Sequence, residues 1–280
     1  MRPQPTVADA LIKLPGVLAL TVRMKLKTAG FLGPLCITGE EMKEIIAASG
    51  MEQRQIMVAL LDIASALSTA DGEGNHIGAV IEGETGGLYI GAPTIWQNKP
   101  LKFSAHGIQS GVMSAWQQGE MRLRSVMVET QPCACCRQFL RETWNWTKLK
   151  IIHAADGPGS WKTGAITEIP LSMDGLKADD LKGRLMGEAQ RNITLSKADT
   201  SDLVNLAADA ASMSYAPYSK NYAGVALRTK KGVIFQGRYA ECSASIAGIL
   251  AVEAALINMA LSGIPMNEVT EAILVETRGT

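Results

Sequence analysis

The hydrophobic pattern of the chain begins with two predicted helices. Residues 38–41 (TGEE) are typical of a capping box, in which the Thr38 hydroxyl and the Glu41 carboxylate each accept a free backbone amide. Apolar residues follow at helical spacing until Gly50, which predicts a helix ending there. A second helix is expected over 52–68. Its apolar stripe consists of Ile56, Leu60, Ile63 and Leu67.

Short apolar runs then alternate with two further predicted helices. A glycine-rich turn separates two predicted strands, which is the pattern of a hairpin. A helix is expected to open at His106, and another to start at the cysteines after Pro132, because proline favours the first helical turn. The predicted strands of this region are 76–82, 88–92, 124–130 and 149–154.

The same succession of elements returns after residue 201. GAVIEGETGGLYIGA in the first half matches GVALRTKKGVIFQGR in the second, which indicates an internal repeat. Ala251 falls where a counterpart of His106 would stand, and no second P-C-x-x-C follows. Each half predicts a mixed sheet with helices on its faces, so the fold class is α/β with two tandem α/β/α units. The expected elements are helices 203–213 and 246–261 and strands 223–227, 233–235 and 272–277.

The pattern divides the chain into four parts. Residues 1–50 form an N-terminal helical segment and 51–155 a first domain with the candidate chemistry. Residues 156–200 show no sustained period and are interpreted as an inter-domain segment. Residues 201–280 form a second, degenerate domain, for which completion of the core and subunit contact are the expected roles.

Composition and charge exclude some partners. Across 280 residues the formal charge is zero and no basic stripe occurs, which argues against nucleic acid as a partner. No apolar run approaches the roughly 20 residues that cross a membrane. The N-terminus predicts an amphipathic helix rather than a signal peptide, because Pro15 and Arg23 interrupt its apolar residues. We therefore expect a cytoplasmic protein, or one in an organelle matrix after removal of a presequence.

The candidate chemistry is a histidine combined with clustered cysteines. Three of the five cysteines lie within four positions, which indicates metal binding in a reducing compartment better than a disulfide framework. His106, Cys133 and Cys136 supply the imidazole and two thiolates that suit Zn²⁺ with a fourth position for water. The competing interpretation is three buried apolar cysteines and a capping histidine. Cys135 is left open as a fourth ligand, a reactive thiol or a buried bystander.

These motifs together resemble the two-domain, homodimeric type of cytidine deaminase. The resemblance is carried by the TGEE helix, the GGLYIGA hairpin, H-x-x-Q-S, PCxxCRQF, and the APYSK…GVAL…YAE stretch over 216–241. It implies a homodimer and a zinc cofactor bound by His106, Cys133 and Cys136. It also implies that the second domain lends a loop containing Glu241 to the pocket of the partner subunit.

The chain departs from the family where the family's chemistry resides. The catalytic glutamate of the family falls on Ile108, and its ribose-binding Asn-x-Glu falls on Pro93-Thr94-Ile95. An aromatic residue is replaced by Asn75, and the asparagine after Glu241 by Cys242. Loss of a positioned proton carrier costs roughly 10²–10⁴ in rate. The candidate pocket residues are Asn75, Pro93, Ile95, Ile108, Cys135, Glu241 and Cys242.

Two functional hypotheses follow from the departures. The first is a zinc-bound pseudoenzyme, kept as a binding protein, an assembly subunit or a part of a larger protein complex. The second is a zinc enzyme with changed chemistry, hydrolysis or acyl transfer, on a small molecule other than cytidine. Residual pyrimidine nucleoside deamination would need a substitute proton carrier. His76 is more typical of a packed core residue, and Glu253 of an interface residue.

Overall fold

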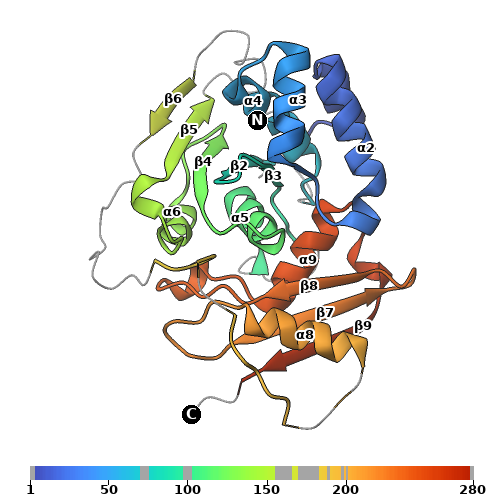
Figure 1. Cartoon of the computed structure of the whole chain (residues 1–280), viewed down its shortest axis with the longest axis vertical. Helices are drawn as coiled ribbons and strands as arrows, with labels where there is room; N and C mark the ends of the chain where they lie inside the picture. The colour runs from blue at the N-terminus through green and yellow to red at the C-terminus, as the bar shows by residue number, and fades with distance from the viewer. Residues whose placement is uncertain are drawn as a thin grey trace.

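The described residues of the computed structural model form two sheets, each between helices. They are 4–69, 76–96, 103–154, 166–169, 183–187, 190–196, 199 and 201–277. Figure 1 shows the larger sheet with the N-terminal helices in one half and the smaller sheet in the other. This mixed α/β architecture confirms the predicted fold class. Within these residues, no helix has the length and hydropathy needed to cross a bilayer.

The larger sheet contains six strands in the order β1-β3-β2-β4-β5-β6. Strands β4 and β5 run parallel, and the other neighbouring pairs are antiparallel. Strand β6 lies in the segment predicted to join the domains, much of which is outside the described residues. The strands are β1 (Cys36–Ile37), β2 (Ala79–Gly83), β3 (Leu88–Gly91), β4 (Leu123–Val128), β5 (Lys150–Ala154) and β6 (Ile166–Ile169).

Successive strand residues point to opposite faces, and each face is covered by helices. On one face Val80 and Met127 pack with helix α4 (Gln53–Ala66). On the other face Ile81 packs in a core with helices α5 (Gly107–Gln117) and α6 (Ala134–Arg141). The sheet therefore separates the N-terminal helices from the two helices that carry the candidate ligands.

The N-terminal helices belong to the core on the α4 side. Helix α1 (Val7–Lys13) and helix α2 (Gly16–Leu32) are separated at Pro15, which caps α2. Helix α3 (Gly39–Ser49) has the predicted capping box: the Glu41 amide donates to the Thr38 hydroxyl, and the Thr38 amide to the Glu41 carboxylate. Gly50 ends it at φ 68°, a conformation that glycine adopts without strain.

The second half has the same order of elements as 53–128. Its sheet has the order β8-β7-β9, which corresponds to β3-β2-β4 of the first half. Helices α8 and α9 pack on opposite faces of this sheet. The elements are α8 (Asp202–Ser212), β7 (Ala223–Thr229), β8 (Ile234–Arg238), α9 (Ala251–Leu261) and β9 (Val269–Glu276). Short 3₁₀ turns are η2 (Trp146–Lys148), η5 (Ser245–Ala247) and η6 (Met266–Glu268).

The predicted helix over 246–261 is wrong in its first turn. Residues 245–247 form the turn η5, and Ile249 then pairs with Ala240 in an isolated bridge. Helix α9 begins at Ala251 because the Glu253 carboxylate accepts the Leu250 amide at 2.7 Å. Leu250, not Ala251, therefore holds the position before the helix that His106 holds before α5.

Candidate metal centre

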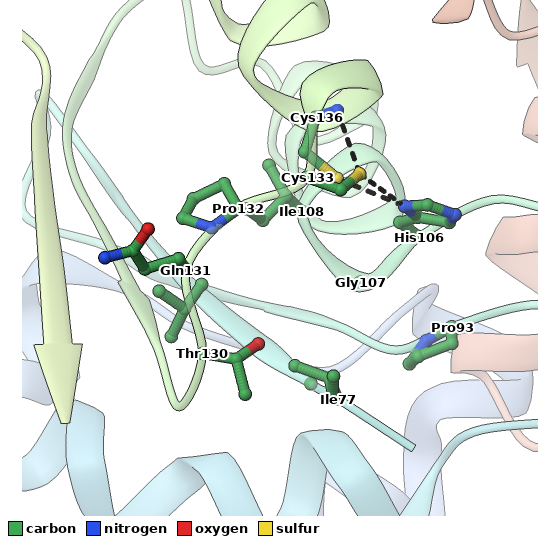
Figure 2. Close-up of a pocket in the computed structure, with 12 residues that line it drawn as sticks. Ile77, Pro93, His106, Gly107, Ile108, Thr130, Gln131, Pro132, Cys133 and Cys136 are labelled. Atoms are coloured by element: carbon green, nitrogen blue, oxygen red, sulfur yellow. Dashed lines mark hydrogen bonds between the residues drawn. The ribbon is translucent and has the colours of Figure 1, made fainter. Parts of the chain in front are cut away.

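His106 stands at the N-terminus of α5, as the residue that caps the helix. Its backbone amide donates to Gln109 Oε1 at 3.0 Å, which fixes the start of the helix. The extended backbone of His106 (φ −79°, ψ 159°) belongs to the cap rather than to the helix. The imidazole is thereby directed away from α5 and toward α6, as Figure 2 shows.

The two cysteines occupy the first turn of α6. Cys133 is the N-cap, and its Sγ accepts the Cys136 backbone amide at 3.5 Å. Free backbone amides at a helix N-terminus favour negative charge, so this position favours a thiolate. Cys136 is buried one turn further along, whereas Cys133 is exposed. Both sulfurs lie on the side of the helix that meets the imidazole.

The spacing of the three ligand atoms fits a zinc ion. His106 Nδ1 lies 3.2 Å from Cys133 Sγ and 3.3 Å from Cys136 Sγ, and the three ligand atoms lie within 4.8 Å of one another. Tetrahedral Zn²⁺ with ordinary Zn–N and Zn–S bonds separates its ligand atoms by roughly 3.5–3.8 Å. A shift of a few tenths of an ångström would accommodate the ion, and one nitrogen with two sulfurs is a donor set that zinc accepts.

The ionisation of the cluster follows from its hydrogen bonds. The pKa of Cys133 is lowered to about 3 by hydrogen bonds from the Cys136 thiol and from His106. The resulting thiolate, together with burial, raises the pKa of Cys136 well above its ordinary value. The hydrogen bond to Cys133 raises the pKa of His106. Binding of Zn²⁺ would replace these shared protons, because a metal takes thiolates and neutral imidazole as ligands.

A cavity of about 200 Å³ opens beside the cluster. Ile77 and Thr130 form the part of its wall that faces the sulfurs in Figure 2. Among the described residues that line it, the ionisable side chains are those of the cluster itself, and none is a carboxylate. The other lining residues are Gly78, Pro93, Gly107, Ile108, Val128, Gln131 and Pro132.

The comparisons with known proteins point to one family. The family model for the cytidine and deoxycytidylate deaminase zinc-binding region matches residues 172–280. A cytidine deaminase from Photobacterium profundum is 33% identical over 271 residues, covering 96% of this chain and 88% of the relative. A cytidine deaminase from Photorhabdus laumondii is 38% identical over 245 residues, covering 87% and 80%.

The chain belongs to the cytidine deaminase family. The residues matched by the family model lie in the second half, whereas the His/Cys/Cys cluster of the described residues lies in the first. Membership of this family, together with a cluster of one imidazole nitrogen and two cysteine sulfurs, supports Zn²⁺ as the cofactor of this chain.

The structure places only some of the predicted pocket residues at the cavity of this deaminase-family chain. Pro93 and Ile108 line it, and Ile108 is 5% exposed. Ile95 does not line the cavity; its backbone amide donates to the Thr69 hydroxyl, and its carbonyl accepts from the same hydroxyl. Cys135 also lies outside the lining and packs, partly buried, against the core. Asn75 lies outside the described residues.

Glu241 and Cys242 are not among the residues that line the cavity. The Glu241 carboxylate accepts the backbone amides of Tyr218 and Ser219, and Cys242 is buried in the core cluster. The role that the family resemblance implied for this loop concerns a partner subunit, so it stays a prediction.

Seven lining residues were not predicted as ligands or pocket residues: Ile77, Gly78, Gly107, Val128, Thr130, Gln131 and Pro132. Ile77 precedes β2, Val128 ends β4, and Thr130 and Gln131 follow it directly before Pro132. The parallel pairing of β4 with β5 would have indicated these residues, because ligand sites form beyond the carboxyl ends of parallel strands. The sequence alone did not show that β4 has a parallel neighbour.

Proposed function

We propose that this protein is a zinc-binding member of the family that no longer deaminates cytidine and serves as a binding or assembly protein. One observation carries the proposal: the described cavity wall beside the cluster has no carboxylate. The family resemblance assigns the position of the family's glutamate to Ile108, which lines this cavity. When bound, zinc supplies a Lewis acid that makes water acidic near neutral pH.

Among the described residues that line the cavity, none outside the cluster offers a proton carrier. Deamination requires a side chain that takes a proton from water and delivers it to the ring and to the leaving amine. Isoleucine has no titratable group. The Thr130 hydroxyl and the Gln131 amide at the cavity do not exchange protons readily at neutral pH. Loss of this function costs roughly 10²–10⁴ in rate.

The two substitute carriers raised by the sequence do not reach the cavity. His76 is absent from the described lining, although its neighbour Ile77 is part of it. Glu253 lies in the second half, where its carboxylate holds the start of α9 through the Leu250 amide. Burial raises the pKa of Glu253, which fits an enclosed structural carboxyl group.

The sugar contacts are also missing. Pro93, at a position where the family binds ribose, lines the cavity with a ring that carries no hydrogen-bond donor. A sugar hydroxyl buried without a partner costs about 1–3 kcal/mol. The cavity of about 200 Å³ is also smaller than the roughly 300–1,000 Å³ typical of drug-sized ligands. These features support a ligand smaller than a nucleoside.

A second candidate function is zinc-dependent hydrolysis or acyl transfer on a substrate other than cytidine. It is favoured by the cluster geometry: three ligands adjoin a cavity, and Cys135 lies outside the group that could hold the ion. A zinc ion with three protein ligands keeps a fourth position for chemistry. Turnover of small neutral esters or amides, abolished by Cys136→Ala, would favour this candidate over a binding role.

We further propose a homodimer in which the second half is a degenerate copy of the first. The common order of strands in the two sheets supports the copy. Large apolar side chains exposed on the second half, including Ile246 (72%) and Leu274 (57%), support a subunit contact there.

Restoring the glutamate alone is expected to leave the protein inactive. The variant Ile108→Glu, loaded with zinc, should form uridine from cytidine no faster than wild type, because Pro93 leaves the sugar without a partner. Uridine would be followed by chromatography after long incubation, with metal content measured on the same sample. Cytidine turnover by Ile108→Glu would contradict the proposed loss of sugar binding.

A further inference from the structure

One segment of the second half contacts both helices that carry the zinc ligands. This segment, residues 241–249, joins β8 to α9 and is called the bridging loop below. In Figure 1 the second half lies directly beneath α5 and α6. His106 precedes α5, and Cys133 and Cys136 open α6, so the relative position of the two helices sets the geometry of the cluster.

The contact with α5 passes through Gln109. Its Oε1 accepts the His106 amide at 3.0 Å, and its Nε2 donates to the Ala247 carbonyl at 2.9 Å. Gln109 is buried at 3% exposure, so both hydrogen bonds are shielded from water. The side chain that fixes the backbone of His106 is thus itself held by the bridging loop.

The contact with α6 passes through two side chains on the same face of the helix. Gln138 Nε2 donates to the Ser243 hydroxyl at 2.7 Å. Glu142, at the end of α6, accepts the Ser243 backbone amide at 2.8 Å. The bridging loop is therefore hydrogen-bonded to α6 at Gln138 and Glu142, which follow the ligand Cys136 along the helix. It is hydrogen-bonded to α5 at Gln109, one turn beyond His106.

Glu142 makes the strongest of these contacts. Its carboxylate is fully buried (0% exposed) and also accepts the hydroxyls of Tyr215 at 2.7 Å and Tyr218 at 2.8 Å. Hydrogen bonds to an ionised acceptor are roughly twice as strong as neutral ones. All three of these donors come from the second half, so one carboxylate joins α6 to two separate segments of it.

We propose that the bridging loop is a positioning element for the zinc site of its own chain. Glu142, at the end of α6, is the principal residue through which the loop positions the cysteines. Zinc tolerates deviations of only about 0.2 Å in its bond lengths. The histidine and the cysteines belong to different helices. Contacts that fix the relative position of these helices therefore set how closely the spacing of the ligand atoms matches the ion. Outer contacts that orient metal ligands are typically worth 10–100-fold in metal affinity.

The chain offers a matched control for Glu142. Glu120 is also a buried carboxylate (2% exposed) that accepts a tyrosine hydroxyl, from Tyr89 at 3.2 Å. It lies beyond the C-terminal end of α5, whereas His106 lies at the N-terminal end. Replacing either glutamate by glutamine removes a buried carboxylate oxygen, but of the two glutamates Glu142 is the one that is hydrogen-bonded to the bridging loop.

The experiment measures zinc affinity by competition with a chromophoric chelator at 20 °C for wild type, Glu142→Gln, Ser243→Ala and Glu120→Gln. The melting temperature of each metal-free protein is measured in parallel. We expect Glu142→Gln to lower zinc affinity by about 10- to 100-fold. Ser243→Ala, which removes one exposed hydroxyl and should fold, is expected to lower it about 2- to 10-fold. Glu120→Gln should stay within twofold of wild type, whatever melting temperature it loses.

Two outcomes would overturn the inference. One is a zinc affinity that follows the melting temperature across all four proteins, since Glu142 would then act through stability alone. The other is a zinc affinity of Ser243→Ala equal to that of wild type. This outcome would overturn the inference even if Glu142→Gln does not fold. The proposal rests on zinc binding at the cluster. If the wild-type protein binds no zinc, the proposed function fails together with the inference. If the wild-type protein binds zinc and the variants bind it equally well, the inference alone fails.

Discussion

Replacing Cys136 by serine is expected to weaken zinc binding by about 10²–10⁴-fold. Structural zinc sites have apparent binding free energies of about 10–16 kcal/mol, so each of three ligands accounts for roughly 3–5 kcal/mol. Cys136 is buried, and its Sγ lies 3.3 Å from His106 Nδ1 within the group of three ligand atoms, which does not include the neighbouring Cys135. Chelator competition on the purified variant measures the loss.

Cys135→Ser is the matched control for this prediction. It makes the same chemical change one residue away, at a thiol outside the group of three ligand atoms. We expect its zinc affinity to stay within about threefold of wild type. A loss in Cys135→Ser comparable to that in Cys136→Ser would show that Cys135 closes the site as a ligand, and would contradict the three-ligand arrangement.

Replacing Gly91 by alanine is expected to destabilise the protein by about 3 kcal/mol or more and to disrupt the zinc site. A Cβ on Gly91 would overlap the Gly107 carbonyl oxygen and crowd the backbone of Gly111. Backbone atoms cannot move aside without shifting α5, and Gly107 follows His106 directly. Denaturant unfolding measures the free-energy change, and chelator competition at low temperature measures zinc affinity.

Gly237→Ala provides the control because it reproduces the crowding in the second half. A Cβ on Gly237 would overlap the Ala251 carbonyl oxygen and crowd Ala255 of α9, in the same arrangement as Gly91 against α5. We expect a comparable loss of unfolding free energy with zinc affinity kept within about tenfold. Equal losses of zinc affinity in both variants would show that Gly91 affects the site only through global stability.

Local features of the fold were predictable because short stretches of sequence determine them. The capping box at Thr38 and the end of α3 at Gly50 need only neighbouring residues. The start of α6 at the cysteines follows likewise from Pro132 and the C-x-x-C spacing. The beginning of α9 was missed because the bridge from Ala240 to Ile249 extends the chain before it.

Features that depend on long-range contacts were not predictable. The family resemblance placed Ile95 in the pocket, yet Ile95 does not line the cavity and its backbone pairs with Thr69. The hydrogen bond from Gln109 to Ala247 joins residues 138 positions apart. No local pattern records such a pairing, so the bridging loop became visible only in the folded chain. The assignment of Ile108 to the position of the family's glutamate also came from the resemblance, and it stays a prediction.

The most direct test of the account measures zinc content and cytidine turnover on one preparation of the wild-type protein. Metal analysis should find about one zinc ion per chain, and prolonged incubation with cytidine should yield no uridine above a protein-free control. Robust formation of uridine by the zinc-loaded protein would contradict the proposal that Ile108 marks the loss of deamination.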